Sequence, residues 1–368
     1  MQMRSLFCAW MLILAIPSCS RKQETPAEPI KAAAPTQSTT PALTQQHKLP
    51  ALPQAPASLG PIRIPDDNSL TPEKVRLGQR LFFDRRLSVD GSHSCYDCHQ
   101  NEDGTGGHDP IGTGAQGKPL TRHAPILWNV AYLPRLYWDG RADSLEAVAK
   151  GAWSGPNMGV GEENLGKKSA EIGALPEYKD DFDNVFPADG ATPGTIEQAL
   201  ASYERTLFCG DTAWDRYIAG QDSALTPEQK QGWELFKGKA ACNACHVPPF
   251  FSDAYLSPEG AFHNNGIGME GKKESEVDIG RMKVTSNPSD WALFKTPSLR
   301  NVSKSAPYFH NGAIAKLEDA VRFMAKGGFK NKNRDSRLVD KQLSDPEIKS
   351  LVAFLGSLEC TGRLVPAP

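Results

Sequence analysis

Two short motifs of cysteine and histidine constrain this chain more than any other feature of its sequence. The first is Cys95-Tyr96-Asp97-Cys98-His99 and the second is Cys242-Asn243-Ala244-Cys245-His246. Two thiols three positions apart can each form a thioether to a haem vinyl group, and the adjacent histidine then reaches the iron. A redox dithiol or half of a zinc site would need only the Cys-x-x-Cys pair. The histidine that follows in both motifs therefore predicts two covalently bound c-type haems.

The side of each iron opposite the motif histidine decides what the haem can do. His99 and His246 are the predicted proximal ligands. A strong sixth ligand makes an electron-transfer site, whereas an open position admits peroxide or oxygen. For the second haem the candidate is Met324, at the end of a short helix, and a His/Met pair raises the reduction potential. The alternatives are that Met324 only packs in the core, or that Met269 or Met282 takes its place.

The first haem has no evident sixth ligand. His108 and His123 lie within reach along the chain, and each is either a ligand or a surface or hydrogen-bonding histidine. We therefore expect this position to be open or weakly held.

Residues 1–19 have the pattern of an export signal. Arg4 supplies the positive charge, and the apolar run at 6–16 is too short to span a membrane as a mature helix. The run ends at Ile16-Pro17-Ser18-Cys19, which is similar to the cleavage site of bacterial lipoproteins, with Cys19 as the lipidated residue. The alternative is an ordinary signal peptide with an incidental cysteine. In both cases we expect a periplasmic protein, and in the first a protein anchored to the membrane at Cys19.

Residues 20–61 are rich in Ala, Pro, Thr and Gln and contain no aromatic residue. Such a segment cannot bury enough apolar surface to offset the entropy lost on ordering. It is predicted to be a disordered tether or, alternatively, a tail that docks a partner. The net charge of -2 over 368 residues gives no indication of nucleic acid as a partner.

An internal repeat surrounds the haem motifs. Leu70-Thr71-Pro72-Glu73 precedes the first motif and Leu225-Thr226-Pro227-Glu228 precedes the second. A threonine followed by proline and glutamate is typical of a helix start. Closing helices are predicted at 195–205 and 344–355. The sequence therefore predicts an all-α, loop-rich fold of two tandem cytochrome c-like domains, at 62–210 and 211–368.

Two cysteines remain once the haem motifs, the signal peptide and the lipid site are assigned. They are Cys209 and Cys360, each near the end of a predicted helix. In an oxidising compartment they are expected to form a disulfide, with two buried free thiols as a close alternative.

The haem motifs stand in a longer pattern that resembles the bacterial dihaem cytochrome c peroxidases and their MauG-like relatives. The resemblance covers about residues 70–358, nearly the whole mature body. The matching stretches are Leu77-Gly78, Leu81-Phe82-Phe83-Asp84, Arg86-Leu87-Ser88, Tyr137-Trp138-Asp139-Gly140-Arg141-Ala142, Leu145-Glu146, Lys295-Thr296-Pro297-Ser298-Leu299-Arg300-Asn301 and Ala306-Pro307-Tyr308-Phe309-His310-Asn311-Gly312.

The resemblance implies a direction of electron flow. In this family the second haem takes electrons from a small cytochrome c or copper protein and passes them to the first, where hydrogen peroxide is reduced. Met324 falls where the peroxidases have the distal methionine of the electron-entry haem, whereas the MauG-like enzymes have a tyrosine. Trp138 matches the tryptophan between the haems, which implies an electron relay, or else packing at the domain interface.

Three positions depart from the family pattern. Peroxidases that need reductive activation have a histidine where this chain has Thr113, which implies a first haem that is ready without activation. The family's catalytic glutamine and glutamate align with Val148 and Asn157. An amide can hydrogen-bond peroxide but cannot carry a proton at neutral pH. Glu162 and Glu163, in the same loop as Asn157, are the candidate substitute acids, and Glu163 is the one assigned to the site.

The family also binds calcium at the domain interface, through an asparagine side chain and backbone carbonyls. Here the carbonyls would come from Ser305 and Pro307. The asparagine position holds His123, and histidine is a poor calcium ligand. The expectation of calcium therefore rests on the two carbonyls alone.

Three functions are compatible with these residues. The first is cytochrome c peroxidase activity, the reduction of hydrogen peroxide with electrons from a small periplasmic donor. The second is MauG-like oxidation of an organic or protein substrate, and the third is electron transfer by a non-enzymatic dihaem protein. The resemblance favours the first, and the altered pocket keeps the other two open. Peroxidases of this kind are often dimers, which is the only ground for expecting a homodimer.

Overall fold

The computed structural model describes residues 51–366, which belong to one compact unit. The predicted signal peptide, Cys19 and most of the predicted tether lie outside the described residues. The last part of that tether is described, and there Leu59 is buried and the Tyr132 hydroxyl donates to the Gly60 carbonyl at 2.8 Å. No helix within residues 51–366 is long and apolar enough to cross a membrane.

The described part of the chain is mostly α-helical, with long loops and little sheet. Two strands of two residues each, β1 (Phe262–His263) and β2 (Phe294–Lys295), pair antiparallel. The helices are α1 (Pro72–Phe82), α2 (Cys95–Cys98), α3 (Leu145–Ser154), α4 (Leu165–Gly173), α5 (Pro176–Val185), α6 (Pro193–Glu204), α7 (Ala213–Ile218), α8 (Pro227–Lys237), α9 (Met282–Thr285), α10 (Leu317–Ala325) and α11 (Asp345–Gly356).

Threonine caps start the first helix of each half of the repeat, as the sequence predicts. The Thr71 hydroxyl accepts a hydrogen bond from the Lys74 N–H at the start of α1. The Thr226 hydroxyl accepts one from the Gln229 N–H at the start of α8. In both helices a proline follows the cap, where its missing N–H costs nothing.

Each half of the repeat packs its first helix against its closing helix. Gly78 of α1 meets the Ala199 carbonyl of α6, and Gly232 of α8 meets the Ser350 carbonyl of α11. A Cβ added at these glycines would lie 1.8 Å and 1.9 Å from the two oxygens. Any larger residue would push the helices apart, so glycine allows the same close crossing in both halves. The predicted repeat is therefore present as two equivalent helix pairs.

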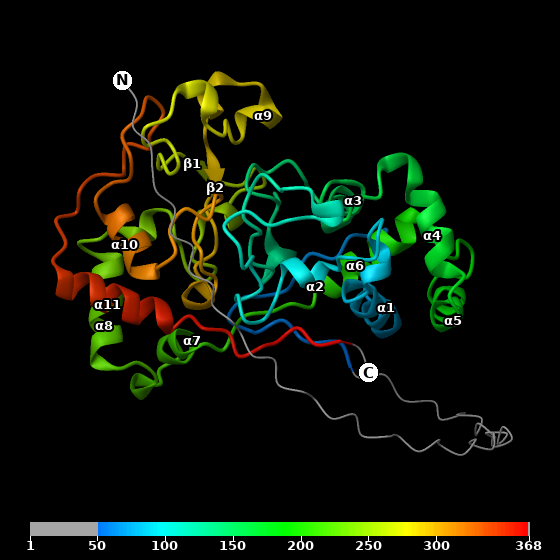
Figure 1. Ribbon diagram of the computed structural model, residues 1–368. Helices are drawn as coiled ribbons and strands as arrows, with labels where there is room; N and C mark the ends of the chain where they lie inside the picture. Colours follow the sequence, from blue (N-terminus) through cyan, green and yellow to red (C-terminus); the bar gives the residue numbers. More distant parts are fainter. Residues whose placement is uncertain (1–50, 367–368) are drawn as a thin grey trace, which may run out of the picture. The chain divides into compact units, whose positions relative to one another are not determined.

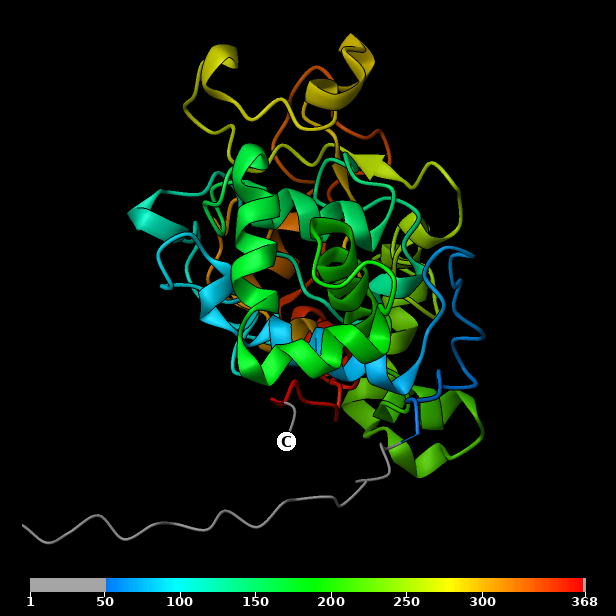
Figure 2. The same ribbon diagram turned by 90° about the vertical axis from the view of Figure 1, so that its right-hand side faces the viewer.

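Two large hydrophobic clusters fill the structure. One is built from residues between 77 and 209, joined by Leu364, and the other from residues between 214 and 358. Figure 1 shows α1, α4, α5 and α6 around the first, and α7, α8, α10 and α11 around the second. Figure 2 views the molecule from the side of α4 and α5. The division into two domains at residues 210 and 211 stays a prediction.

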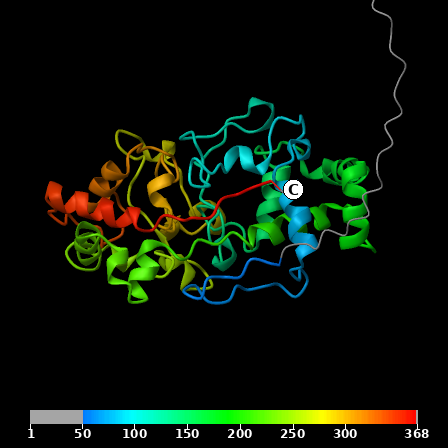
Figure 3. The same cartoon turned by 90° about the horizontal axis from the view of Figure 1, so that it is seen from below.

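The segment after α11 ties the two clusters together. It runs back toward α1 and α2, as Figure 3 shows, and buries Leu364. The Leu364 N–H and carbonyl both hydrogen-bond to the side chain of Asn101, each at 2.8 Å. Cys209 and Cys360 form a disulfide in the same region. Of the two alternatives for these cysteines, the disulfide is therefore confirmed.

Candidate haem cavities

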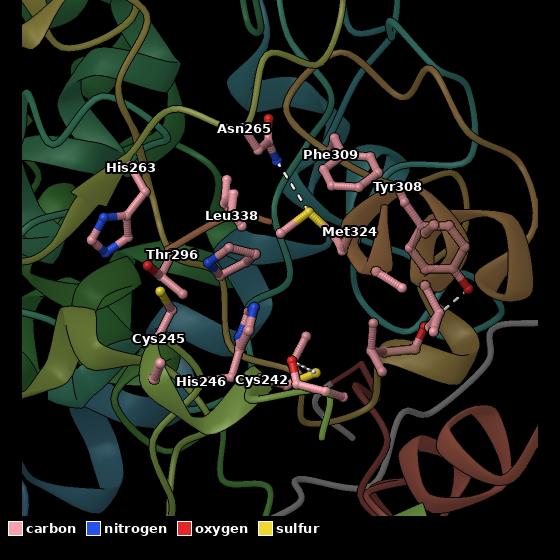
Figure 4. Close-up of a pocket in the computed structure, with 18 of the residues that line it drawn as sticks. Cys242, Cys245, His246, His263, Asn265, Thr296, Tyr308, Phe309, Met324 and Leu338 are labelled. Atoms are coloured by element: carbon pink, nitrogen blue, oxygen red, sulfur yellow. Dashed lines mark hydrogen bonds between the residues drawn. The ribbon is translucent and has the colours of Figure 1, made fainter. Parts of the chain in front are cut away.

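The second haem motif opens onto a cavity of about 230 Å³, named here the His246 cavity (Figure 4). Cys242, Cys245 and His246 line it. The His246 Nδ1 donates a hydrogen bond to the Phe251 carbonyl at 2.9 Å. Because a carbonyl only accepts, Nδ1 carries the proton and Nε2 keeps its lone pair for a metal.

Met324 projects from α10 into the same cavity as His246 (Figure 4). The Asn265 Nδ2 lies 3.6 Å from the Met324 sulfur and holds it in place. Three apolar residues at helical spacing on α10 also face the cavity, namely Leu317, Ala320 and Val321. The sequence predicted Met324 as the partner of His246, and the structure brings the two side chains to one cavity.

The other candidate methionines lie elsewhere. Met269 is buried in a separate cluster with Trp291, and Met282 packs against that cluster. Neither lines the His246 cavity. Among residues 51–366, Met324 is therefore the methionine available to a metal held by His246.

The first haem motif opens onto a larger cavity of about 1060 Å³, named here the His99 cavity. Cys98 and His99 line it, and Cys95 packs against the adjacent hydrophobic cluster. The His99 Nδ1 donates to the Thr105 carbonyl at 2.8 Å, which leaves Nε2 for a metal. Burial lowers the pKa of His99 and of His246 below the usual range. Both imidazoles are therefore neutral near pH 7, as a metal ligand must be.

The donor set at each cavity fits a c-type haem. The four motif cysteines, Cys95, Cys98, Cys242 and Cys245, are free thiols. Two thiols and one neutral histidine are what covalent attachment and proximal ligation require. Apolar and aromatic side chains line both cavities, and they suit a porphyrin face.

Trp138 and Lys295 line both cavities and so stand in the wall between them. The Trp138 Nε1 donates to the His123 carbonyl at 2.8 Å, and the Trp138 carbonyl accepts from the Lys295 N–H at 2.8 Å. The role of Trp138 as a relay between two haems stays a prediction from the family resemblance. Burial lowers the pKa of the Lys295 amino group to about 8. Nothing in the sequence around Lys295 predicted a role for this lysine.

Val148 and Asn157 both line the His99 cavity. Val148 is on α3, and its carbonyl accepts a hydrogen bond from the Tyr137 hydroxyl at 3.1 Å. Asn157 follows α3, and its backbone carbonyl accepts from the Ala115 N–H at 3.0 Å. This wall of the cavity thus carries a valine and an amide side chain, neither of which can transfer a proton.

Neither Glu162 nor Glu163 lines the cavity, so the structure does not support Glu163 as the substitute acid. Its side chain is exposed and accepts a hydrogen bond from the Asn164 Nδ2 at 3.0 Å. The chain leaves the cavity through Gly159 and Gly161, whose φ angles of 72° and 81° turn it toward the surface. Proximity to Asn157 in sequence therefore did not place Glu163 beside it in space.

Of the residues expected around the open side of the first haem, some are exposed at the surface and one is buried in the His99 cavity. Thr113 is exposed, in a small bridge with Pro119, and His108 is exposed and pairs with Asp103 at 3.0 Å. His123 is buried and lines the His99 cavity, with its Nδ1 donating to the Asp109 carbonyl at 3.0 Å. Apart from His99 and His123, no residue of the described lining carries an imidazole or a thioether.

The predicted calcium ligands lie in the same region. Ser305 and Pro307 line the His99 cavity, as does His123. Calcium prefers oxygen ligands, and the His123 side chain has only ring nitrogens, of which Nδ1 is bonded to the Asp109 carbonyl. Calcium binding stays an expectation from the family resemblance.

Glu204 is a residue of the His99 cavity that the sequence analysis missed. It ends α6, and its carboxyl group is buried in the cavity wall. Burial raises its pKa to about 8. A signal was present in the sequence, because Ile196, Leu200 and Glu204 are spaced four apart and share the apolar face of the predicted helix. A carboxyl group on a packed helix face is a functional candidate.

Comparison with known proteins identifies relatives of this chain. The profile of a family described as di-haem cytochrome c peroxidase matches residues 72–223. Cytochrome-c peroxidase IdrP1 of Denitromonas iodatirespirans is 35% identical over 328 residues, which cover 83% of this chain and 87% of that protein. The methylamine utilization protein MauG of Methylorubrum extorquens is 36% identical over 310 residues, which cover 83% of each.

Solved structures show the same fold. The crystal structure of a MauG-like protein associated with microbial copper homeostasis has a TM-score of 0.77 and 29% identity, and the match covers 84% of this chain and 96% of that one. The diheme peroxidase BthA of Burkholderia thailandensis has a TM-score of 0.65 at 21% identity, a likeness of fold alone. The relatives thus include both peroxidases and MauG-like proteins.

Proposed function

This chain belongs to the di-haem cytochrome c peroxidase family, and from that premise we propose that it reduces hydrogen peroxide to water with electrons from a small periplasmic cytochrome c or copper protein. The observation that carries the proposal is the difference between the two cavities. His246 shares its cavity with Met324, a good iron ligand. His99 shares its cavity with Val148 and Asn157, which bind iron weakly or not at all, and with His123, whose Nδ1 is bonded to the Asp109 carbonyl.

The motif residues have assigned roles in holding the haems. The thioethers are assigned to Cys95, Cys98, Cys242 and Cys245, and the iron ligands to His99, His246 and Met324. When bound, the haems supply one-electron transfer and, where a coordination position is open, a place for peroxide. The His246 cavity is then the electron-entry site and the His99 cavity the peroxide site.

The side chains of the His99 cavity are assigned three further roles: orienting peroxide, supplying a proton and relaying electrons. Asn157 can donate a hydrogen bond to peroxide and orient it. Reduction of peroxide to water consumes protons as well as electrons, and Glu204 can hold a proton near neutral pH because burial raises its pKa to about 8. Trp138, which lines both cavities together with Tyr308 and Phe309, is the aromatic group to which we assign the relay of electrons.

The purified dihaem protein tests this function directly. Peroxide consumption is measured with a reduced small cytochrome c, and the spin state of each haem is recorded. Peroxidase function predicts a high-spin haem at His99 and fast turnover without prior reductive activation. Two low-spin haems and no turnover would instead indicate a non-enzymatic electron-transfer protein.

A second function, oxidation of an organic or protein substrate in the manner of MauG-like enzymes, is favoured by one observation. Val148 and Asn157 leave the wall of the His99 cavity beside α3 without an acid. High-spin iron with slow peroxide turnover, together with oxidation of an added substrate, would support this function over the first.

The protein is also proposed to be exported and held to a bacterial membrane by lipid on Cys19. The apolar run and the Cys19 context support this. Incorporation of labelled fatty acid by the full-length chain, and its loss in Cys19→Ser, is the expected result. An unlabelled but exported protein would indicate an ordinary signal peptide.

A further inference from the structure

Four cationic side chains, named here the basic rim, belong to the segment that follows α10 beside the His246 cavity: Lys326, Lys330, Arg337 and Lys341. Between residues 325 and 343 the chain has six basic and two acidic residues, although its net charge as a whole is -2. The charge of this segment is therefore opposite in sign to that of the whole protein.

Two of these cations lie at the edge of the cavity itself. Arg337 and Lys341 both line it, as does Asp335, whose carboxylate pairs with the Arg337 guanidinium at 2.7 Å. The Arg337 guanidinium also donates to the carbonyl of Ala244 at 3.0 Å. Ala244 stands between the two motif cysteines and is exposed. The basic rim thus reaches the point where the haem attachment motif meets solvent.

The other two cations are free to meet a partner. Lys326 and Lys330 are exposed, and neither forms an ion pair with any other residue of the range 51–366. Lys326 follows Met324 by two positions, so it stands at the end of the helix that supplies the predicted iron ligand. Unpaired surface cations contribute most to the long-range attraction of an anion.

Apolar surface lies within the same rim. Leu338 lines the cavity, and Val339, between Arg337 and Lys341, is 49% exposed. A small apolar patch surrounded by charges beside a redox centre is typical of a transient protein–protein interface. The charged residues attract the partner and orient it, and the apolar patch packs against the partner's surface.

The opposite charge lies at a distance. Residues 162–189, which include α4 and α5, carry eight acidic and three basic residues. Figure 1 shows these helices on the side of the molecule away from α10 and α11. This separation of charge attracts an acidic partner to the rim and repels it from α4 and α5.

We propose that the basic rim docks an electron-donor protein whose surface around its own redox centre is acidic. The proposal rests on the proposed function in one respect, namely that electrons enter at the His246 cavity. It does not depend on peroxide being the substrate.

The experiment measures electron entry alone, in the absence of peroxide. The oxidised holoprotein is mixed with either of two reduced single-haem cytochromes c, one with an acidic surface and one with a lysine-rich surface. Stopped-flow absorbance gives the second-order rate constant for haem reduction. The acidic donor should react faster, and its rate should fall as ionic strength rises from about 10 mM to about 500 mM.

Charge-reversal variants distinguish the effect of the basic rim on the rate of reduction from the effect of the protein's net charge. Lys326→Glu/Lys330→Glu should slow reduction by the acidic donor about tenfold at low ionic strength and have no effect at high ionic strength. Lys167→Glu/Lys179→Glu, on α4 and α5, makes the same change in net charge and should leave the rate unchanged. Unaltered haem spectra will show that both variants are folded.

Two results would overturn the proposal. One is equal slowing in the two variants, which would indicate net charge alone. Another is faster reduction by the lysine-rich donor at low ionic strength. If the rim variant slows reduction but the wild-type protein does not consume peroxide, the docking site stands and the peroxidase function fails.

Discussion

The Asn265 amide nitrogen lies 3.6 Å from the Met324 sulfur, in the cavity that His246 also lines. These three residues are far apart in sequence, and the fold gathers them at one point. A donor held against one of the two lone pairs of a thioether sulfur fixes the side chain and leaves the other lone pair for a metal. The contact is therefore suited to a methionine that ligates a metal.

Replacing Met324 tests its role as the ligand of the electron-entry haem. Met324→Leu keeps the apolar volume but removes the sulfur, so the reduction potential of one haem should fall by on the order of 100 mV, within the ~0.8 V range that axial ligands span. Spectroelectrochemical titration measures the shift. Met269→Leu is the matched control, since Met269 is buried away from the cavity. Equal potentials in wild type and Met324→Leu would assign the ligand elsewhere.

Restoring an acid in the His99 cavity tests the proton argument. Asn157→Glu should raise peroxide turnover by about tenfold or more, because a positioned general acid contributes ~10²–10⁴-fold. Steady-state peroxide consumption is the measurement. Asn164→Glu, on the exposed side of the same loop, should have no effect. An unchanged rate in Asn157→Glu would indicate that Glu204 already supplies the proton.

Glu204 should make stability depend on pH. Its pKa rises from 4.5 to about 8 on folding because the carboxyl group is buried. The folded state therefore holds a proton that the unfolded state releases above pH 4.5. This stabilisation is complete below that pH and is lost as pH rises through about 8.

Glu204→Gln removes this titration. Between pH 5 and pH 9 the free energy of unfolding of the wild-type protein should fall by roughly 3–5 kcal/mol more than that of Glu204→Gln. Denaturation with guanidinium at each pH measures it. Glu163→Gln changes an exposed carboxyl group and should retain the wild-type profile. Parallel pH profiles for wild type and Glu204→Gln would show that Glu204 does not titrate on unfolding.

The disulfide between Cys209 and Cys360 should stabilise the protein strongly, because it spans 151 positions. Loss of both sulfurs in Cys209→Ser/Cys360→Ser should lower the free energy of unfolding by up to about 5 kcal/mol, since the unfolded chain gains the freedom of a long loop. Guanidinium denaturation under non-reducing conditions measures it. If reductant lowers the wild-type midpoint to that of the variant, the loss comes from the disulfide. A variant as stable as wild type would contradict the expectation.

Local chemistry was enough to predict the haem sites. Thioether attachment and proximal ligation need two thiols and a histidine within one helical turn, so spacing alone predicts His99 and His246 as ligands, and each of them lines a cavity in the structure. The helix starts at Thr71 and Thr226 were equally local, because a cap is completed within four residues.

Side-chain placement around the cavities depended on contacts between distant segments. Glu163 follows Asn157 by six positions and yet is exposed, because the turn at Gly159 and Gly161 carries the chain to the surface. Glu204 was overlooked because its burial depends on which face of α6 packs against the first cluster. Whether a carboxyl group meets water or a cavity is decided by such long-range packing, and packing in turn sets its pKa.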